Sequence, residues 1–169
     1  MDIKKKQQQL KELAASLKGF SDAELEAREQ EIIKKADEND AAVAKKEFKL
    51  PTENYKVVAA GIQSLLNKQT VEWQYTLGLV SMYEFWNPDR YSKTITYPML
   101  DATLRTLGEM KFTGYEEWAK VIAINKYFES LRAEYEETTE SIYDIANEHN
   151  AIIDELALRR PQTEASAQK

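Results

Sequence analysis

The fold of this chain is decided by residues 113–160, which read TGYEEWAKVIAINKYFESLRAEYEETTESIYDIANEHNAIIDELALRR. After Gly114 the stretch contains neither glycine nor proline, the two residues that most often end a helix. Apolar residues recur three and four positions apart, which places them on one face of a helix. This seam comprises Val121, Ile124, Phe128, Leu131, Tyr135, Thr138, Ile142, Ile145, His149, Ile152 and Leu156. The pattern predicts one long helix over 113–160 with a coiled-coil-like seam.

The composition of the whole chain favours an all-α protein. Five glycines and four prolines in 169 residues leave little turn chemistry for a many-stranded sheet, whereas the plentiful glutamate, lysine, alanine and leucine are good helix formers. Aromatic residues concentrate between Trp73 and Tyr143, and we interpret them as the large side chains of a hydrophobic core. A helical bundle body is therefore expected.

The chain is predicted to contain an arm, a body and a tail. Residues 1–50 form the N-terminal helical arm of two helices, the second opened by Ser21 and Glu24, which have the spacing of a capping box. A helical core body is predicted over 51–131, and Pro51 marks its start. The long helix, 113–160, is shared between this body and an acidic arm, and residues 161–169 are expected to be a flexible tail.

Local signals predict several boundaries within the body. Thr52 is expected to cap a helix that runs to about Lys68, and Thr113 and Glu116 have capping-box spacing at the start of the long helix. Residues 91–97, YSKTITY, are β-branched and aromatic, so they suit an extended loop or a short strand, although no partner strand is evident. Residues 147–150 are poor helix formers, and a break in the long helix is most easily accommodated there.

Charge and hydropathy limit the partners and the location. The net charge is −6, and nine acidic residues accompany the single cation Arg132 within 129–155. Such a surface repels phosphates and predicts no direct binding of nucleic acid. No run approaches the ~20 apolar residues of a membrane span, and residues 1–10 lack the apolar segment of a signal peptide. We expect a protein of the cytoplasm or of a virion, not secreted by a signal peptide.

No catalytic, cofactor-binding or metal-binding residues are predicted. The chain has no cysteine and one histidine, His149, which excludes thiolate zinc sites and sites that need several histidines. The residue three positions before His149 is Ala146, so the Glu-x-x-His motif of di-iron bundles is absent. Neither a glycine-rich phosphate loop nor a nucleophile elbow occurs. We interpret His149 as a polar seam residue that fixes register, and we expect a non-enzymatic protein.

The acidic part of the long helix is the predicted interaction site. Its seam residues are Tyr135, Ile142, Ile145, His149, Ile152 and Leu156. Two surfaces are expected to be able to cover them: the chain's own first helix, which is basic and carries a leucine stripe, or another protein chain.

Three functions are compatible with this pattern. The leading hypothesis is a structural or assembly protein that forms a homo-oligomer or a multi-protein assembly. Its preferred setting is that of a small virion component or assembly factor of a tailed bacteriophage. The alternatives are a cytoplasmic acidic helical adaptor or inhibitor, including a DNA mimic, and a small ligand-binding or enzymatic helical bundle.

Overall fold

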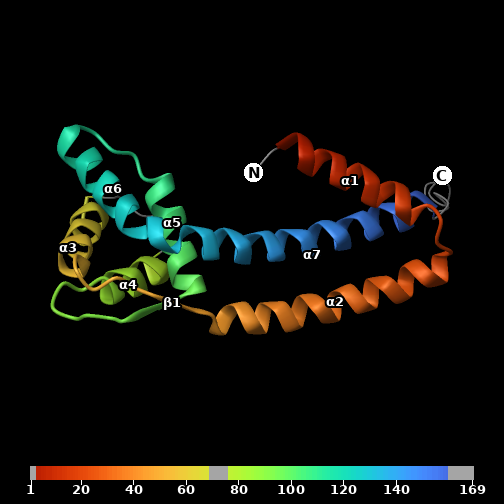
Figure 1. Ribbon diagram of the computed structural model, residues 1–169, viewed down its shortest axis with the longest axis horizontal. Coiled ribbons are helices and arrows are strands. Elements are labelled where there is room, and N and C mark those ends of the chain that lie inside the picture. The colour runs from red at the N-terminus through yellow and green to blue at the C-terminus, as the bar shows by residue number, and fades with distance from the viewer. Residues whose placement is uncertain (1–2, 69–75, 160–169) are drawn as a thin grey trace, which may run out of the picture. The chain divides into compact units, whose positions relative to one another are not determined.

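A computed structural model describes residues 3–68 and 76–159 of the chain (Figure 1). Of the residues described, 79% are helical and the strands among them are two short ones, which confirms the all-α prediction. The chain divides into two compact units, residues 1–41 with 138–169 and residues 42–137. Their boundaries fall within helices α2, Asp22–Lys45, and α7, Arg132–Arg159. The predicted tail, 161–169, lies outside the described residues.

In the unit of residues 1–41 and 138–169, three helices pack around one apolar cluster. Helix α1, Ile3–Leu17, is followed after a short turn by α2, and the distal part of α7 packs against both. Arg28 of α2 bonds Glu148 of α7, and Asn39 bonds Ser141. The later residue of α2 contacts the earlier residue of α7, so the two helices run antiparallel. The cluster consists of Leu17, Leu25, Ile32, Ile145, Ile152 and Leu156.

The predicted capping box at the start of α2 is confirmed. The Ser21 amide donates a hydrogen bond to the Glu24 carboxylate at 2.7 Å, and the Glu24 amide donates to the Ser21 hydroxyl at 3.3 Å. The bond from the Ser21 amide, and after it the one that the Ser21 hydroxyl donates to the same carboxylate at 2.7 Å, lower the pKa of Glu24. Phe20, which precedes the cap, packs against the apolar cluster that contains Leu25, as the staple spacing of these two residues requires.

The unit of residues 42–137 holds most of the aromatic core. Its elements are β1 (Glu47–Lys49), α3 (Tyr55–Leu66), α4 (Thr76–Phe85), β2 (Thr94–Thr96), α5 (Tyr97–Glu109), α6 (Tyr115–Phe128) and the short 3-10 helix η2 (Glu129–Leu131). Helix α3 packs along α6, and α4 packs against α3 and α5.

Trp86 lies at the centre of this core and is fully buried. Its ring stacks on Tyr55 and meets Phe128 edge-on. Its indole N–H donates a hydrogen bond to the Thr103 hydroxyl at 3.1 Å, so the polar atom of this large side chain has a partner. The prediction that aromatic residues build the core holds for these three rings.

The short strand expected at 91–97 has a partner that sequence reasoning missed. Strand β2 pairs antiparallel with β1, with Phe48 opposite Ile95, and both of these side chains are buried. Residues 47–49 lie within the segment predicted as the arm, residues 1–50, and they belong to the unit of residues 42–137. The two strands are far apart in the sequence, so no local sequence signal predicts that they pair.

The prediction of one unbroken helix over 113–160 is wrong in its details. The stretch forms α6, the 3-10 turn η2 and then α7, so the helix tightens at Glu129–Leu131. No break occurs at Asn147–Asn150, where helix propensity is poor. Ile145 and Ile152 are buried on either side of that segment, and this burial outweighs propensity.

Two predicted helix starts also differ from the structure. Helix α3 begins at Tyr55 after Asn54, so Thr52 does not cap it. Helix α6 begins at Tyr115, and its N-cap is Gly114 with φ of 99°, a conformation that glycine adopts without a Cβ clash. The Thr113 amide donates a hydrogen bond to Glu117 and not to Glu116.

None of the described helices combines the length and the apolar character that a membrane span requires.

Candidate helix-docking surface

Three of the predicted seam residues lie in the core of their own unit. Ile145, Ile152 and Leu156 have exposed fractions of 8%, 0% and 6%. They pack with Leu17 of α1 and with Leu25 and Ile32 of α2. The first helix, one of the two expected covers, contributes Leu17, and α2, which was not expected to cover the seam, contributes Leu25 and Ile32. Side chains buried in this way offer no free surface to a partner.

The other three seam residues have different surroundings. Tyr135 belongs to the unit of residues 42–137, where its ring stacks on Tyr97 and its hydroxyl donates to the Asp101 carboxylate at 2.7 Å. Ile142 is half-buried, and so is His149. The Nε2 atom of His149 is itself buried, and no hydrogen-bond partner for it occurs among the residues described.

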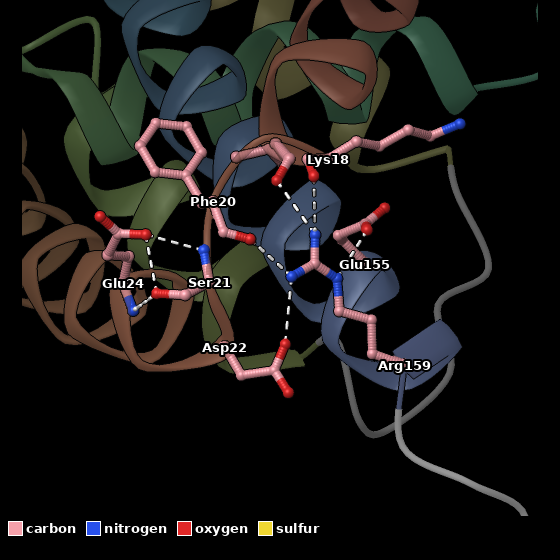
Figure 2. A network of polar contacts seen from close by, with 8 residues as sticks. Lys18, Phe20, Ser21, Asp22, Glu24, Glu155 and Arg159 are labelled. Carbon is pink, nitrogen blue, oxygen red and sulfur yellow. Dashed lines mark hydrogen bonds and ion pairs between the residues drawn. The ribbon is translucent and has the colours of Figure 1, made fainter.

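In the unit of residues 1–41 and 138–169, Arg159 at the end of α7 binds the turn between α1 and α2 (Figure 2). Sequence reasoning missed this role. Its Nη1 donates to the carbonyl oxygen of Phe20 at 2.6 Å, and its Nη2 donates to those of Leu17 and Lys18, each at 3.3 Å. The last carbonyls of a helix have no partner within it. The guanidinium, with its fan of donors, therefore caps α1 from another element.

The same guanidinium also binds two carboxylates. Asp22 at the start of α2 accepts a hydrogen bond from Nη1 at 3.1 Å, and Glu155 one turn earlier on α7 accepts from Nε at 2.8 Å (Figure 2). These bonds, the one to Asp22 first, raise the pKa of Arg159. The sequence offered one sign of this role of Arg159, namely that a basic residue stands at the C-terminus of a predicted helix.

A second stripe on α7 remains open to solvent. It consists of Ala146, Asn150, Ile153 and Ala157, and we call it the outer stripe. These positions are four, three and four apart, so they share one helix face, displaced by about one residue from the buried seam. Ala146, Asn150 and Ala157 are exposed, and Ile153 is 41% exposed. The 3-4 spacing of the outer stripe is visible in the sequence. The neighbouring seam is more apolar, so the sequence favours the seam as the contact surface.

The C-terminal half of the outer stripe, Ile153 and Ala157, borders a groove between α7 and α2. The groove has a volume of about 310 Å³ and is lined by Glu29, Ile153, Leu156 and Ala157. Helix α1 lies against a different side of α7, where Lys6, Leu10 and Leu13 meet Asp144, Asn147 and Glu148.

On α2 the groove is lined by Glu29, and further acidic residues share the helix face of Glu29. Residues at helical spacing from Glu29 make up the acidic stripe, which consists of Glu26, Glu29, Ile33, Asp37 and Asp40. Ile33 is 37% exposed. A helix placed in the groove would meet small and apolar side chains from α7 and carboxylates from α2.

The described residues contain no arrangement that binds a metal. No group of three or more histidine or acidic side chains there is placed to hold an ion. Comparison with protein-family models, with curated proteins and with solved structures found no match.

Proposed function

We propose that this protein is a non-enzymatic structural or assembly protein that binds other proteins through helix–helix contacts. The observation that carries the proposal is the groove beside the outer stripe. Alanines at 146 and 157 allow a neighbouring helix to approach closely, and Ile153 and Ile33 supply exposed apolar surface. A partner helix seated there would add a fourth helix to the three of this unit.

Charge identifies the kind of helix that this groove fits. The acidic stripe places four carboxylates around Ile33, so a second acidic helix would be repelled. A partner helix with an apolar face flanked by lysine or arginine would complement the carboxylates of Glu29, Asp37 and Asp40. The acidic character also supports the choice of a protein partner over nucleic acid.

Site-specific photo-crosslinking in the cell that makes the protein tests the groove. A crosslinking residue at Ala146 or Ala157 should capture the same partner, and the captured segment should be helical with basic flanks. A crosslinker at the exposed Ala15 of α1 provides the control. Ile153→Lys should abolish capture because it puts a charge into the contact. Equal capture from Ala15, or capture that survives Ile153→Lys, contradicts the groove as the binding surface.

For the setting of this function we propose a tailed bacteriophage, with the protein as a small virion component or assembly factor. The support is compositional: a cysteine-free, helical, tyrosine-rich chain with nine tyrosines. A tagged copy produced during infection should co-purify with virions or with their assembly intermediates. Its absence from both fractions, at normal expression, contradicts this setting without bearing on the groove.

A further inference from the structure

Among the described residues of the unit of residues 42–137, three exposed large apolar side chains lie on α6. Tyr115, Trp118 and Ile122 have exposed fractions of 87%, 52% and 53%. They are three and four residues apart, so they form one stripe, which we call the α6 face. The buried residues of α6, among them Val121, Ile124 and Phe128, point to the opposite side. Exposed tyrosine and tryptophan at such spacing are typical of interface hot spots.

The α6 face is held in a fixed shape by its neighbours. The ring of Phe112 packs edge-on against Trp118, with 5.5 Å between ring centroids. On the other side of the helix, Lys68 of α3 binds Glu117 at 2.7 Å and Lys120 donates to Ser64 at 2.9 Å. These contacts anchor α6 to α3, so the exposed stripe is presented on a rigid element, which reduces the entropy lost on binding.

We propose that the α6 face is a self-association surface that pairs with the same face of a second copy, the two α6 helices running antiparallel. Charge complementarity selects this partner. Glu116 flanks the N-terminal end of the stripe, next to Tyr115, and Lys126 lies one turn beyond Ile122 at its C-terminal end, both exposed. An antiparallel pair centred at Val121 sets Glu116 of each copy level with Lys126 of the other. A two-fold axis repeats the contact, as closed homodimers require.

The middle of the stripe is suited to this pairing. In the antiparallel register Trp118 of one copy packs near Ile122 of the other, and Ala119 and Ala123 leave room for the indole. Buried aromatic side chains cover ~150–250 Å² each, so the exposed fractions give a face of roughly 400 Å² per copy. Standard stable interfaces bury ~800 Å² per partner. The pairing should therefore be reversible, with a dissociation constant in the micromolar range.

Sedimentation velocity and light scattering of the full chain over a range of concentrations test the pairing. We expect the mass to rise from that of one 19.5-kDa chain to twice that value and no further. Ile122→Glu should weaken association at least tenfold because it buries a charge in the contact. Val57→Glu, on α3 at a position that is 69% exposed, is the matched control and should leave association unchanged. Circular dichroism should show both variants folded.

A charge reversal distinguishes antiparallel pairing from a general hydrophobic contact. Lys126→Glu should weaken association by about tenfold, since two symmetry-related surface ion pairs each contribute about threefold. Adding Glu116→Lys to that variant should restore it. A chain that is monomeric at every concentration overturns the proposal. So does an oligomer larger than a dimer, an association unaffected by Ile122→Glu, or a double variant that stays weak. None of these residues belongs to the groove beside α7.

Discussion

Nη1 of Arg159 donates a hydrogen bond of 2.6 Å to the carbonyl oxygen of Phe20, a residue 139 positions away in the chain. The same guanidinium reaches the carbonyls of Leu17 and Lys18, so the end of α7 supplies the C-terminal cap of α1. A basic side chain there also interacts favourably with the helix dipole. Arg159 thus holds the turn between α1 and α2, although nothing in the sequence of that turn predicts this contact.

Arg159→Ala should loosen α1. The three carbonyls lose the guanidinium, although that of Leu17 still accepts from the Phe20 amide, and we expect amides of residues 10–17 to exchange hydrogen faster and the melting temperature to fall. Arg159→Lys should restore only part of the protection, because an ammonium lacks the planar fork of the guanidinium. Arg132→Ala is the control, since Arg132 pairs with Glu129 and Glu136 on neighbouring turns. Unchanged exchange in α1 of Arg159→Ala would show that the cap is dispensable.

Adjacent isoleucines on α7 should respond differently to truncation. Ile152 is fully buried, whereas Ile153 is 41% exposed. Ile152→Ala should lower the free energy of unfolding by about 2–5 kcal/mol through lost burial and a residual cavity. Ile153→Ala should change it by less than about 1 kcal/mol. Urea denaturation of the two variants measures both values, and equal losses would contradict the assignment of Ile152 to the core.

Replacing His149 by methionine should stabilise the protein. The buried Nε2 has no hydrogen-bond partner among the described residues, and an unsatisfied buried polar atom costs about 1–3 kcal/mol. Methionine fills a similar space without that atom. Asn150→Met, at the exposed neighbouring position, should bring no such gain. A destabilised His149→Met variant, measured by urea denaturation, would instead indicate that the imidazole makes a favourable contact.

Tyr127 should make stability fall at alkaline pH. Burial raises the pKa of its phenol from 10 to about 12, and the hydroxyl donates to the Pro51 carbonyl at 2.8 Å. Above pH 10 the phenol ionises in the unfolded chain while it stays neutral in the folded one. Its contribution is therefore complete below pH 10 and is lost as the pH rises towards 12.

Tyr127→Phe provides the matched comparison for this pH dependence. The difference in unfolding free energy between wild type and variant should change between pH 10 and 12 and stay constant from pH 7 to 9. The other tyrosines are common to both proteins, so their ionisation cancels. A difference that is constant up to pH 12 would show that Tyr127 ionises as readily in the folded protein as in the unfolded one.

Some local features were predictable because their causes are local. Ser21 and Glu24 are three residues apart, and their two hydrogen bonds form as the spacing predicts. The 3-4 spacing of the seam likewise predicted that Ile145, Ile152 and Leu156 share one apolar helix face, and all three are buried. By contrast, Thr52 and Thr113 were expected to cap helices, and at both places the chain begins the helix later. Thr113 and Glu116 have the same three-residue spacing as Ser21 and Glu24, so capping-box spacing by itself does not fix where a helix begins.

The candidate docking surface was less predictable than the core. The sequence favoured the most apolar stripe of α7 as the contact surface, but α1 and α2 cover its Ile145, Ile152 and Leu156. The outer stripe, with Ala146 and Ile153, has the same spacing and lower hydrophobicity. Only knowledge of which faces are already occupied distinguishes a surface for partners from a surface for folding.

The sequence by itself determined the helical class, the capping box at Ser21 and the apolar face of α7, since propensity, capping and periodicity act within a few turns of one helix. Tertiary structure alone decided what covers that face, where the long helix tightens, and which residue caps α1. It also decided that Phe48 lies opposite Ile95. Each of these results joins residues far apart in the chain, and their energies depend on burial and on donors and acceptors brought together only when the chain folds.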